Sequence, residues 1–136
     1  MAKVEKSRRN SKGYPKYLDN LARTLLRLQC GDKCQRCNKP VDGRDSQTHH
    51  IVSRKYYSTR WEMCNLVLLC AACHRRYHDG LFGKDWFAVK FPKKNNELTA
   101  KVASGQQRTT WRTSDFEAVE ARLLQELSEE KQRSLA

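Results

Sequence analysis

Two kinds of metal-binding side chain are concentrated in the middle of the sequence. All four histidines and two C-x2-C cysteine pairs fall between residues 34 and 78: Cys34, Cys37, His49, His50, Cys70, Cys73, His74 and His78. Thiolate and imidazole are the side chains that proteins use to bind zinc and other transition metals. The sequence therefore predicts metal chemistry in this segment.

The cysteine spacing favours a structural zinc site. The pairs Cys34/Cys37 and Cys70/Cys73 are separated by 32 residues, and two such knuckles supply the four thiolates of a tetrahedral zinc ion. The N-terminus is charged and lacks the apolar stretch of a secretory signal, and no apolar run is long enough to cross a membrane. We therefore expect a cytoplasmic protein whose cysteines stay reduced and bind metal instead of forming disulfides.

Other arrangements of the thiols remain open from the sequence. The cysteines could pack as small apolar side chains, although two independent pairs make this the weaker interpretation. Cys30 could replace Cys34 as a ligand, or His74 could complete a site with three cysteines. A C2H2 zinc finger is excluded, because positions 54–56, where its last histidine would follow His50, hold Arg, Lys and Tyr.

The histidines favour a second metal site. If residues 70–79 form a helix, His74 and His78 lie one turn apart on one face and can hold an ion together. His49 and His50, on a preceding strand, could add another ligand and a free imidazole. On a regular strand these two neighbours would point to opposite faces. Histidines that contact phosphate, or only pack under the helix, are the alternative.

The patterns around these residues predict the elements that must position them. Helical spacing of apolar residues, with Pro15 near the start, predicts a helix over residues 15–29 that Gly31 ends. The segments that follow are expected to form, in order, a short strand over 47–52, a polar loop over 53–62, a strand or turn over 65–69 and a helix over 70–79.

The last third of the chain is expected to be mainly helical. Because Pro92 breaks any continuous helix over residues 84–102, this stretch fits either two short helices or a hairpin, and we favour the helices. Ser114 with Glu117 has the spacing of a capping box, and the apolar residues after it predict a helix to about residue 131.

Charge divides the chain unequally. There are 27 Lys and Arg against 15 Asp and Glu, a net charge of +12, which indicates a polyanionic partner such as nucleic acid. Residues 114–136 carry −3 and the remainder carries +15. We divide the chain into a basic disordered arm at 1–13, a metal-binding domain with its N-terminal helix at 14–83, and a helical extension at 84–136.

The central segment resembles the HNH endonucleases, the ββα-metal class of nuclease. His50, Asn65 and His74 give the pattern H-x14-N-x8-H. The sequence THHIVSR is similar to the strand that carries the general base in that family, and NLVLLCAACH to the segment that enters its helix. The resemblance covers residues 34–78. It implies an α+β fold with a small ββα-metal core, stapled by the four-cysteine zinc site and flanked by N-terminal and C-terminal helices.

The resemblance also implies a role for each residue that matches the motif. His50 would be the general base that activates water, and Asn65 would tie the loop to the frame so that His50 is aimed correctly. His49 and His74 would be ligands of a catalytic ion, and His78 resembles the third histidine ligand found in part of the family. Three imidazoles suit Mn²⁺, Ni²⁺ or Zn²⁺, and we expect Mn²⁺ or Mg²⁺ to support turnover.

The implied substrate is DNA. Cations surround the histidines in the sequence, and we expect them to hold phosphates: Arg54, Lys55, Arg60, Arg75 and Arg76. Because no base-reading motif is present, we expect a monomer that nicks duplex DNA with little sequence specificity. Family members of this size in phages and restriction systems suggest packaging or restriction partners. A non-catalytic, zinc-stabilised nucleic-acid-binding module is the alternative function.

Overall fold

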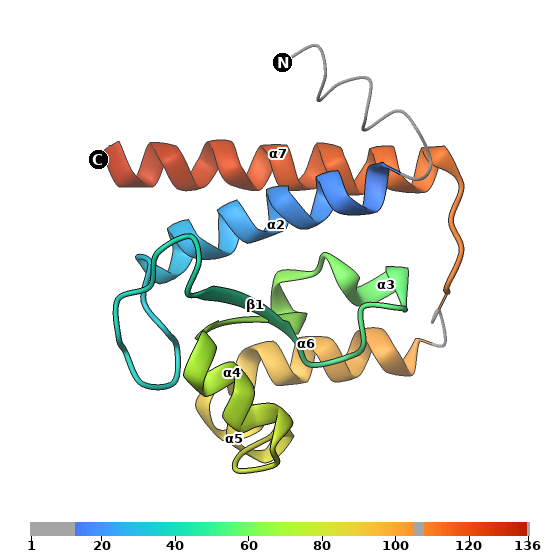
Figure 1. Cartoon of the computed structure of the whole chain (residues 1–136). Helices are drawn as coiled ribbons and strands as arrows, with labels where there is room; N and C mark the ends of the chain where they lie inside the picture. The colour runs from blue at the N-terminus through green and yellow to red at the C-terminus, as the bar shows by residue number, and fades with distance from the viewer. Residues whose placement is uncertain (1–12, 105–107, 136) are drawn as a thin grey trace.

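The computed structural model describes residues 13–104 and 108–135 and has a mixed α and β architecture. The expected basic arm, except Gly13, lies outside the described residues. A two-stranded antiparallel sheet lies between a pair of long helices and a group of shorter ones (Figure 1). In the part of the chain that is described, no helix is both long and apolar enough to cross a membrane.

The first helix, α2 (Tyr14–Cys30), forms where the apolar spacing predicts it. Pro15 lies in its first turn, where a missing backbone N–H costs nothing. The helix buries one apolar face, made of Tyr14, Leu18, Ala22, Leu25 and Leu26. Gly31, with φ 61°, ends the helix in the left-handed conformation that glycine adopts most easily.

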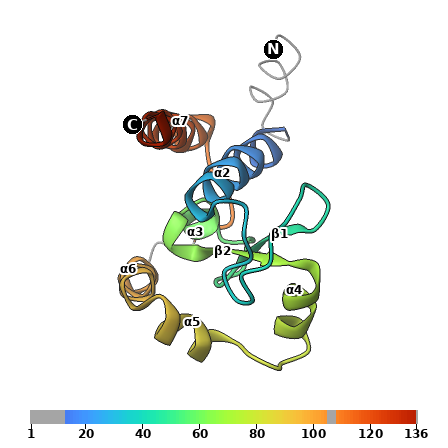
Figure 2. The ribbon, with the colours of Figure 1, turned by 90° about the vertical axis from the view of Figure 1, so that its left-hand side faces the viewer.

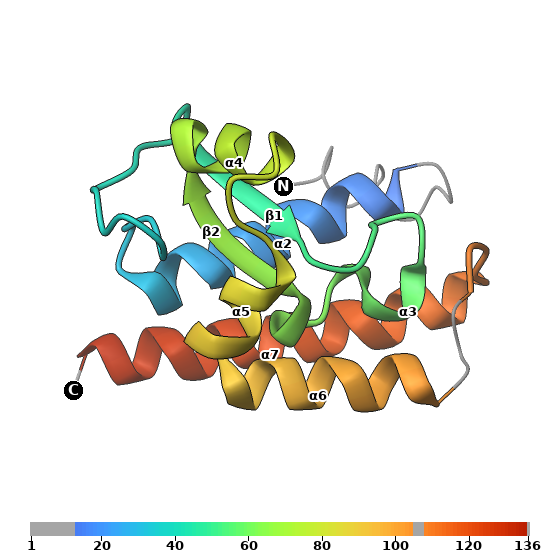
Figure 3. The same cartoon turned by 90° about the horizontal axis from the view of Figure 1, so that it is seen from below.

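The central unit is a hairpin followed by a helix. Strand β1 (Ser46–His50) pairs with β2 (Leu66–Cys70) in a register that places His49 opposite Val67, and α4 (Ala71–His78) follows without a break. Every residue of β2 is buried, because α2 and α4 both pack against this strand. Figure 3 shows the two strands side by side with α2 behind them. The expected ββα core is confirmed.

The connection between the strands is more ordered than the sequence predicts. Residues 53–62, expected to be an irregular loop, contain a helical turn, α3 (Tyr57–Arg60). A 3₁₀ turn, η1 (Met63–Asn65), follows and leads into β2. Tertiary packing explains the order, because Tyr57 and Trp61 contact Trp111, which lies ahead of the last helix. Trp61 is only 1% exposed, so this aromatic ring belongs to the core.

Three helices complete the chain, and they confirm the helical interpretation of its last third. They are α5 (Lys84–Lys90), α6 (Pro92–Ala103) and α7 (Thr113–Leu135). The stacked rings of Tyr14 and Phe116, 5.3 Å apart, lie between α2 and α7. Figure 2 views this helix pair nearly end on, above the sheet.

The start of α7 differs in detail from the prediction. Ser114 lies inside the helix, so it does not cap it. Instead the Asp115 carboxylate accepts a hydrogen bond of 3.0 Å from the backbone N–H of Arg112. Because the helix begins at Thr113, two residues earlier than the pattern suggests, Asp115 makes the capping hydrogen bond expected of Glu117.

Candidate metal centres

The four paired cysteines converge at the end of β2. Their Sγ atoms all lie within 4.8 Å of one another, and the Sγ atoms of Cys37 and Cys70 are 3.8 Å apart. A tetrahedral zinc ion with Zn–S bonds of about 2.3 Å has sulfur–sulfur edges of roughly 3.8 Å. Cys34, Cys37, Cys70 and Cys73 are therefore positioned for a zinc site, and Cys30 is not part of the cluster.

The first knuckle is attached to the outer edge of β2. The backbone N–H of Gln35 donates to the carbonyl of Leu68, and the Gln35 side-chain oxygen accepts from the Leu68 N–H, both at 2.8 Å. The Arg36 backbone N–H lies 3.4 Å from the Cys34 sulfur. Gln35 thus pairs with the edge of β2 through both its backbone and its side chain. No motif in the sequence predicts this role.

The second knuckle forms the N-terminus of α4. The Cys70 sulfur accepts from the Cys73 backbone N–H at 3.4 Å and so caps the helix. Asp45 accepts from the N–H of Ala71 at 2.9 Å and pairs with Lys39 at 3.1 Å. Asp45 and Lys39 therefore brace the knuckle from the loop before β1, and sequence reasoning missed both.

The protonation of the cluster is consistent with a bound dication. Although burial opposes ionisation, backbone N–H donors lower the pKa of Cys34 to about 7. Burial and the neighbouring thiols raise the pKa of Cys37 to about 12. Since a second thiolate would lie beside the first, the four cysteines need a cation to ionise together, and zinc supplies it.

Three histidines form a second cluster on the α4 side of the sheet. The imidazole nitrogens of His49, His74 and His78 lie within 4.8 Å of one another, and the Nε2 atoms of His74 and His78 are 3.0 Å apart. Two nitrogens that bind one ion at about 2.1 Å lie roughly 3.0–3.4 Å apart. The spacing of the rings therefore fits a single metal ion.

His49 is the buried member of this cluster. Its side chain packs 4.0 Å from the Tyr77 ring, centroid to centroid. The His49 Nε2 atom is buried and has no hydrogen-bond partner among the described residues. A buried nitrogen without a partner is costly unless it binds something, and an ion between the three rings satisfies it.

The environment keeps His49 neutral, as a metal ligand must be. Burial, and then the nearby imidazoles of His74 and His78, lower its pKa from 6.5 to about 4. Burial likewise lowers the pKa of His74. Neutral imidazole has a lone pair to donate, so the cluster can bind metal below neutral pH.

In protein with zinc bound but no ion at the histidines, we expect His49 to stay neutral until the pH falls to about 4. Between pH 6.5 and 4, His49 then binds a proton in the unfolded chain but not in the folded one. Its contribution to the free energy of unfolding is therefore fully present above pH 6.5 and is lost as the pH falls toward 4. Titration of the His49 ring by NMR measures this pKa. A midpoint near 6.5 would contradict the buried environment.

His50 lies on the other face of β1, as strand alternation requires. Its Nε2 is 3.0 Å from the carbonyl oxygen of Arg60. A carbonyl can only accept, so in neutral His50 the proton is on Nε2, and Nδ1 is free to accept another. His50, the last residue of β1, nevertheless lines the same cavity of about 340 Å³ as His49, His74 and His78. The opposed directions of the two histidines therefore do not separate them.

Asn65 connects the residues around His50. Its side-chain oxygen accepts from the Val52 N–H at 2.7 Å, and its amide nitrogen donates to the carbonyls of Val52 and Thr59 at 3.1 and 3.0 Å. The side chain is fully buried. Asn65 thus ties the segment just after His50 to the end of α3.

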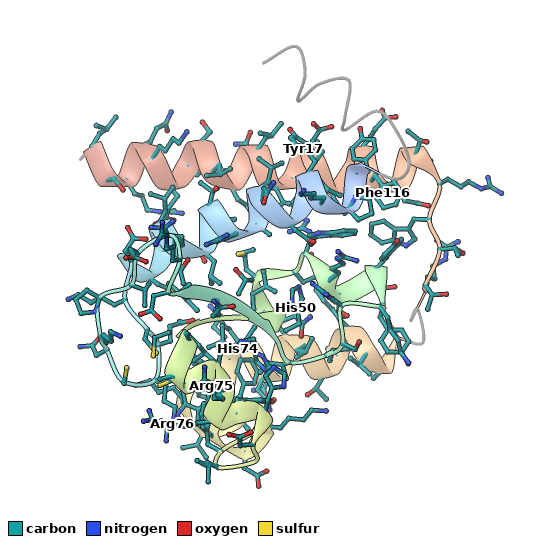
Figure 4. All side chains as sticks on the ribbon, in the orientation of Figure 1. Tyr17, His50, His74, Arg75, Arg76 and Phe116 are labelled. Atoms are coloured by element: carbon teal, nitrogen blue, oxygen red, sulfur yellow. The ribbon has the colours of Figure 1, made fainter. Side chains whose placement is uncertain are left out.

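The cationic residues expected to contact DNA differ in their exposure and in whether they form an ion pair within the protein. Arg54, Lys55, Arg75 and Arg76 are exposed, and Arg54 lines the cavity. Figure 4 labels Arg75 and Arg76 on α4, below His50 and His74. Arg60 is different, because its guanidinium makes two hydrogen bonds to Asp19, at 3.0 and 2.7 Å. Asp19 lies on α2 and was not among the residues singled out from the sequence.

Residues 34–80 match the family model described as HNH endonuclease. The matched segment contains all four cysteines of the zinc site, all four histidines and Asn65, so the resemblance seen in the sequence is confirmed. The match supports a nuclease-type function in general. No curated protein and no solved structure was found to match the chain.

Proposed function

We propose that this HNH protein is a metal-dependent endonuclease that hydrolyses phosphodiester bonds of DNA. The observation that carries the proposal is the shared cavity: His50, with one nitrogen free to accept a proton, faces the same space as the three-histidine cluster. Hydrolysis of a phosphodiester needs a base of nearly neutral pKa and a positive charge at the phosphate, and the cavity brings groups for both together.

His50 acts as the general base. Its Nδ1 takes one proton from a water molecule while the water oxygen attacks phosphorus, the bond from phosphorus to the 3′ oxygen breaks, and the departing 3′ oxygen takes a proton from solvent water. Burial lowers the pKa of His50, so the ring is unprotonated and ready to accept that proton at neutral pH. Asn65 positions the ring by fixing the chain at Val52, two residues beyond it.

His49, His74 and His78 are proposed to hold the divalent ion. When bound, a divalent cation there offsets the negative charge that builds on the phosphate and on the departing oxygen. Three imidazoles favour Mn²⁺, Ni²⁺ or Zn²⁺ over Mg²⁺ as the bound ion, and Mn²⁺ or Mg²⁺ is proposed for turnover. The three side chains come from β1 and both turns of α4, so the sheet and helix must be held together for the site to exist.

Arg54, Lys55, Arg75 and Arg76 are proposed to hold the phosphates that flank the cut. All four are exposed; Arg54 lines the cavity, Lys55 follows it in the chain, and Arg75 and Arg76 lie on α4, which also carries His74 and His78. Contacts of this kind carry little sequence information and weaken steeply with salt. A chain with one such cavity cuts one strand at a time, so a monomer nicks duplex DNA with low specificity.

A supercoiled-plasmid assay tests the proposal. With Mn²⁺ or Mg²⁺ present we expect conversion to open circles, and in the absence of added divalent ion we expect none, because the phosphate charge is then uncompensated. Zinc content measured in each sample separates loss of the catalytic ion from loss of the structural one. Salt-sensitive DNA binding without cutting under Mg²⁺, Mn²⁺, Ni²⁺ or Zn²⁺ would instead identify a non-catalytic nucleic-acid-binding module.

A further inference from the structure

A carboxylate outside the HNH-matching segment is connected to His50 through one peptide group. Asp19 of α2 accepts three hydrogen bonds: from Arg60 Nε at 3.0 Å, from Arg60 Nη2 at 2.7 Å and from the indole N–H of Trp61 at 2.8 Å. Two parallel bonds between Arg and a carboxylate fix both direction and distance, and they are stronger than neutral hydrogen bonds.

Arg60 and Trp61 are consecutive, and the peptide group between them carries the Arg60 carbonyl. That carbonyl is the one that lies 3.0 Å from Nε2 of His50. Asp19 therefore fixes the side chains on both sides of the peptide group that orients His50. Arg122 of α7 adds a third constraint, since its guanidinium donates to the Trp61 carbonyl at 3.3 Å.

The connection has the burial expected of an ordered contact. The Trp61 side chain is fully buried, and the side chains of Arg60 and Asp19 are 15% and 31% exposed. Arg27 of α2 forms another ion pair, with Asp32 just after the end of the helix. It makes a single hydrogen bond of 2.6 Å to Asp32, and both side chains are more exposed than that of Arg60. Only the Asp19 pair is directed at the residues around His50.

We propose that Asp19 is a positioning residue for His50, acting through the Arg60–Trp61 peptide group. By fixing the Arg60 carbonyl as the acceptor for Nε2, Asp19 keeps the ring in one orientation and one tautomer, with Nδ1 available to the cavity. The hydrogen bond made by one ring nitrogen decides which nitrogen carries the proton. The kinetic part of this inference rests on the proposed nuclease function, whereas the ring orientation can be measured without it.

The test compares wild type with Asp19→Asn, which keeps the size of the side chain but removes its charge and places an amide against the Arg60 guanidinium. Asp32→Asn is the matched control, because it removes an ion pair from the same helix and Asn tolerates the left-handed φ of 56° at that position. We expect kcat to fall roughly tenfold to 100-fold in Asp19→Asn, with KM for DNA unchanged. Loss of residues that orient a functional side chain without touching the substrate typically has an effect of this size. Asp32→Asn should cleave as wild type does.

A second readout is the ¹⁵N NMR spectrum of the His50 ring. We expect a single Nε2–H tautomer in wild type and in Asp32→Asn, and a mixture in Asp19→Asn. If Asp19→Asn does not fold, Arg60→Lys, which keeps the charge but loses the paired hydrogen bonds, should show the same mixture. A folded Asp19→Asn protein with the wild-type tautomer and kcat overturns the inference. If wild type does not cleave DNA at all, the nuclease proposal fails, and the tautomer alone decides the role of Asp19.

Discussion

Replacing His50 with alanine should lower the rate of DNA cleavage by roughly 10²–10⁴-fold, the range that a positioned general base contributes. The reason is the proposed role of His50: its Nε2 lies 3.0 Å from the Arg60 carbonyl, which leaves Nδ1 to accept a proton, and the residue lines the same cavity as the histidine cluster. The three proposed ligands are not changed by this substitution, so both metal sites should still fill. Single-turnover cleavage of plasmid under the best metal measures the effect.

Stability should change little in the same variant. Removing the ring deletes one hydrogen bond that contributes about 1 kcal/mol, and the partner left behind is a backbone carbonyl close to a cavity that water can enter. Gln47→Ala is a suitable control, because Gln47 lies on the same strand and its side-chain amide makes a long hydrogen bond of 3.4 Å to the Arg44 carbonyl. Partial recovery of His50→Ala cleavage by added imidazole would identify the missing group as a base. Cleavage at the wild-type rate without rescue would rule out His50.

Loss of the zinc ligand Cys73 should unfold the central part of the protein. The Cys73 side chain is fully buried. Cys73 lies in the first turn of α4, directly before His74. Structural zinc contributes an apparent 10–16 kcal/mol in small zinc-dependent folds, more than the net stability of many whole domains, about 5–15 kcal/mol. In Cys73→Ser we therefore expect no bound zinc and loss of the fixed aromatic packing, measured by metal analysis and near-ultraviolet circular dichroism.

Cys64→Ala is the matched control for this substitution. Cys64 is also buried, at 5% exposure, but it lies outside the four-cysteine cluster. Its replacement leaves only a small cavity, so we expect about 1–2 kcal/mol of destabilisation with one zinc retained. If Cys73→Ser kept its zinc and melted with Cys64→Ala, the cysteine cluster would have no structural role.

The elements that repeat a local pattern were predictable from the sequence. The 3.6-residue period of apolar residues predicts α2, and the apolar run at 66–69 indicates β2. The C-x2-C spacing predicts the candidate zinc ligands, because two thiols at that spacing can reach one ion. His49 and His50 could be assigned through their resemblance to a motif. The cavity that they share could not, because it forms between β1, the segment after it and α4, which come together only in the folded chain.

The parts that depend on contacts between distant segments were not predictable. Asp19 is a single acidic residue on an amphipathic helix, and nothing near it in sequence indicates that it reaches Arg60, 41 residues further on. The helical turn at Tyr57–Arg60 has no period of its own and forms against rings from other parts of the chain. Arg60 was predicted to contact DNA, yet its guanidinium is already bound to Asp19.

The pairing of α2 with α7 above the sheet limits how far the HNH-matching segment can be treated as a portable module. Excision of residues 34–80 would keep the four clustered cysteines and all four histidines but discard Asp19, which bonds to the Arg60 and Trp61 side chains, and Arg122, which bonds to the Trp61 carbonyl. Grafted onto another scaffold, such a fragment would carry the residues of both candidate metal sites but would leave His50, the proposed base, without its proposed support. The transferable unit for engineering is the segment together with both flanking helices.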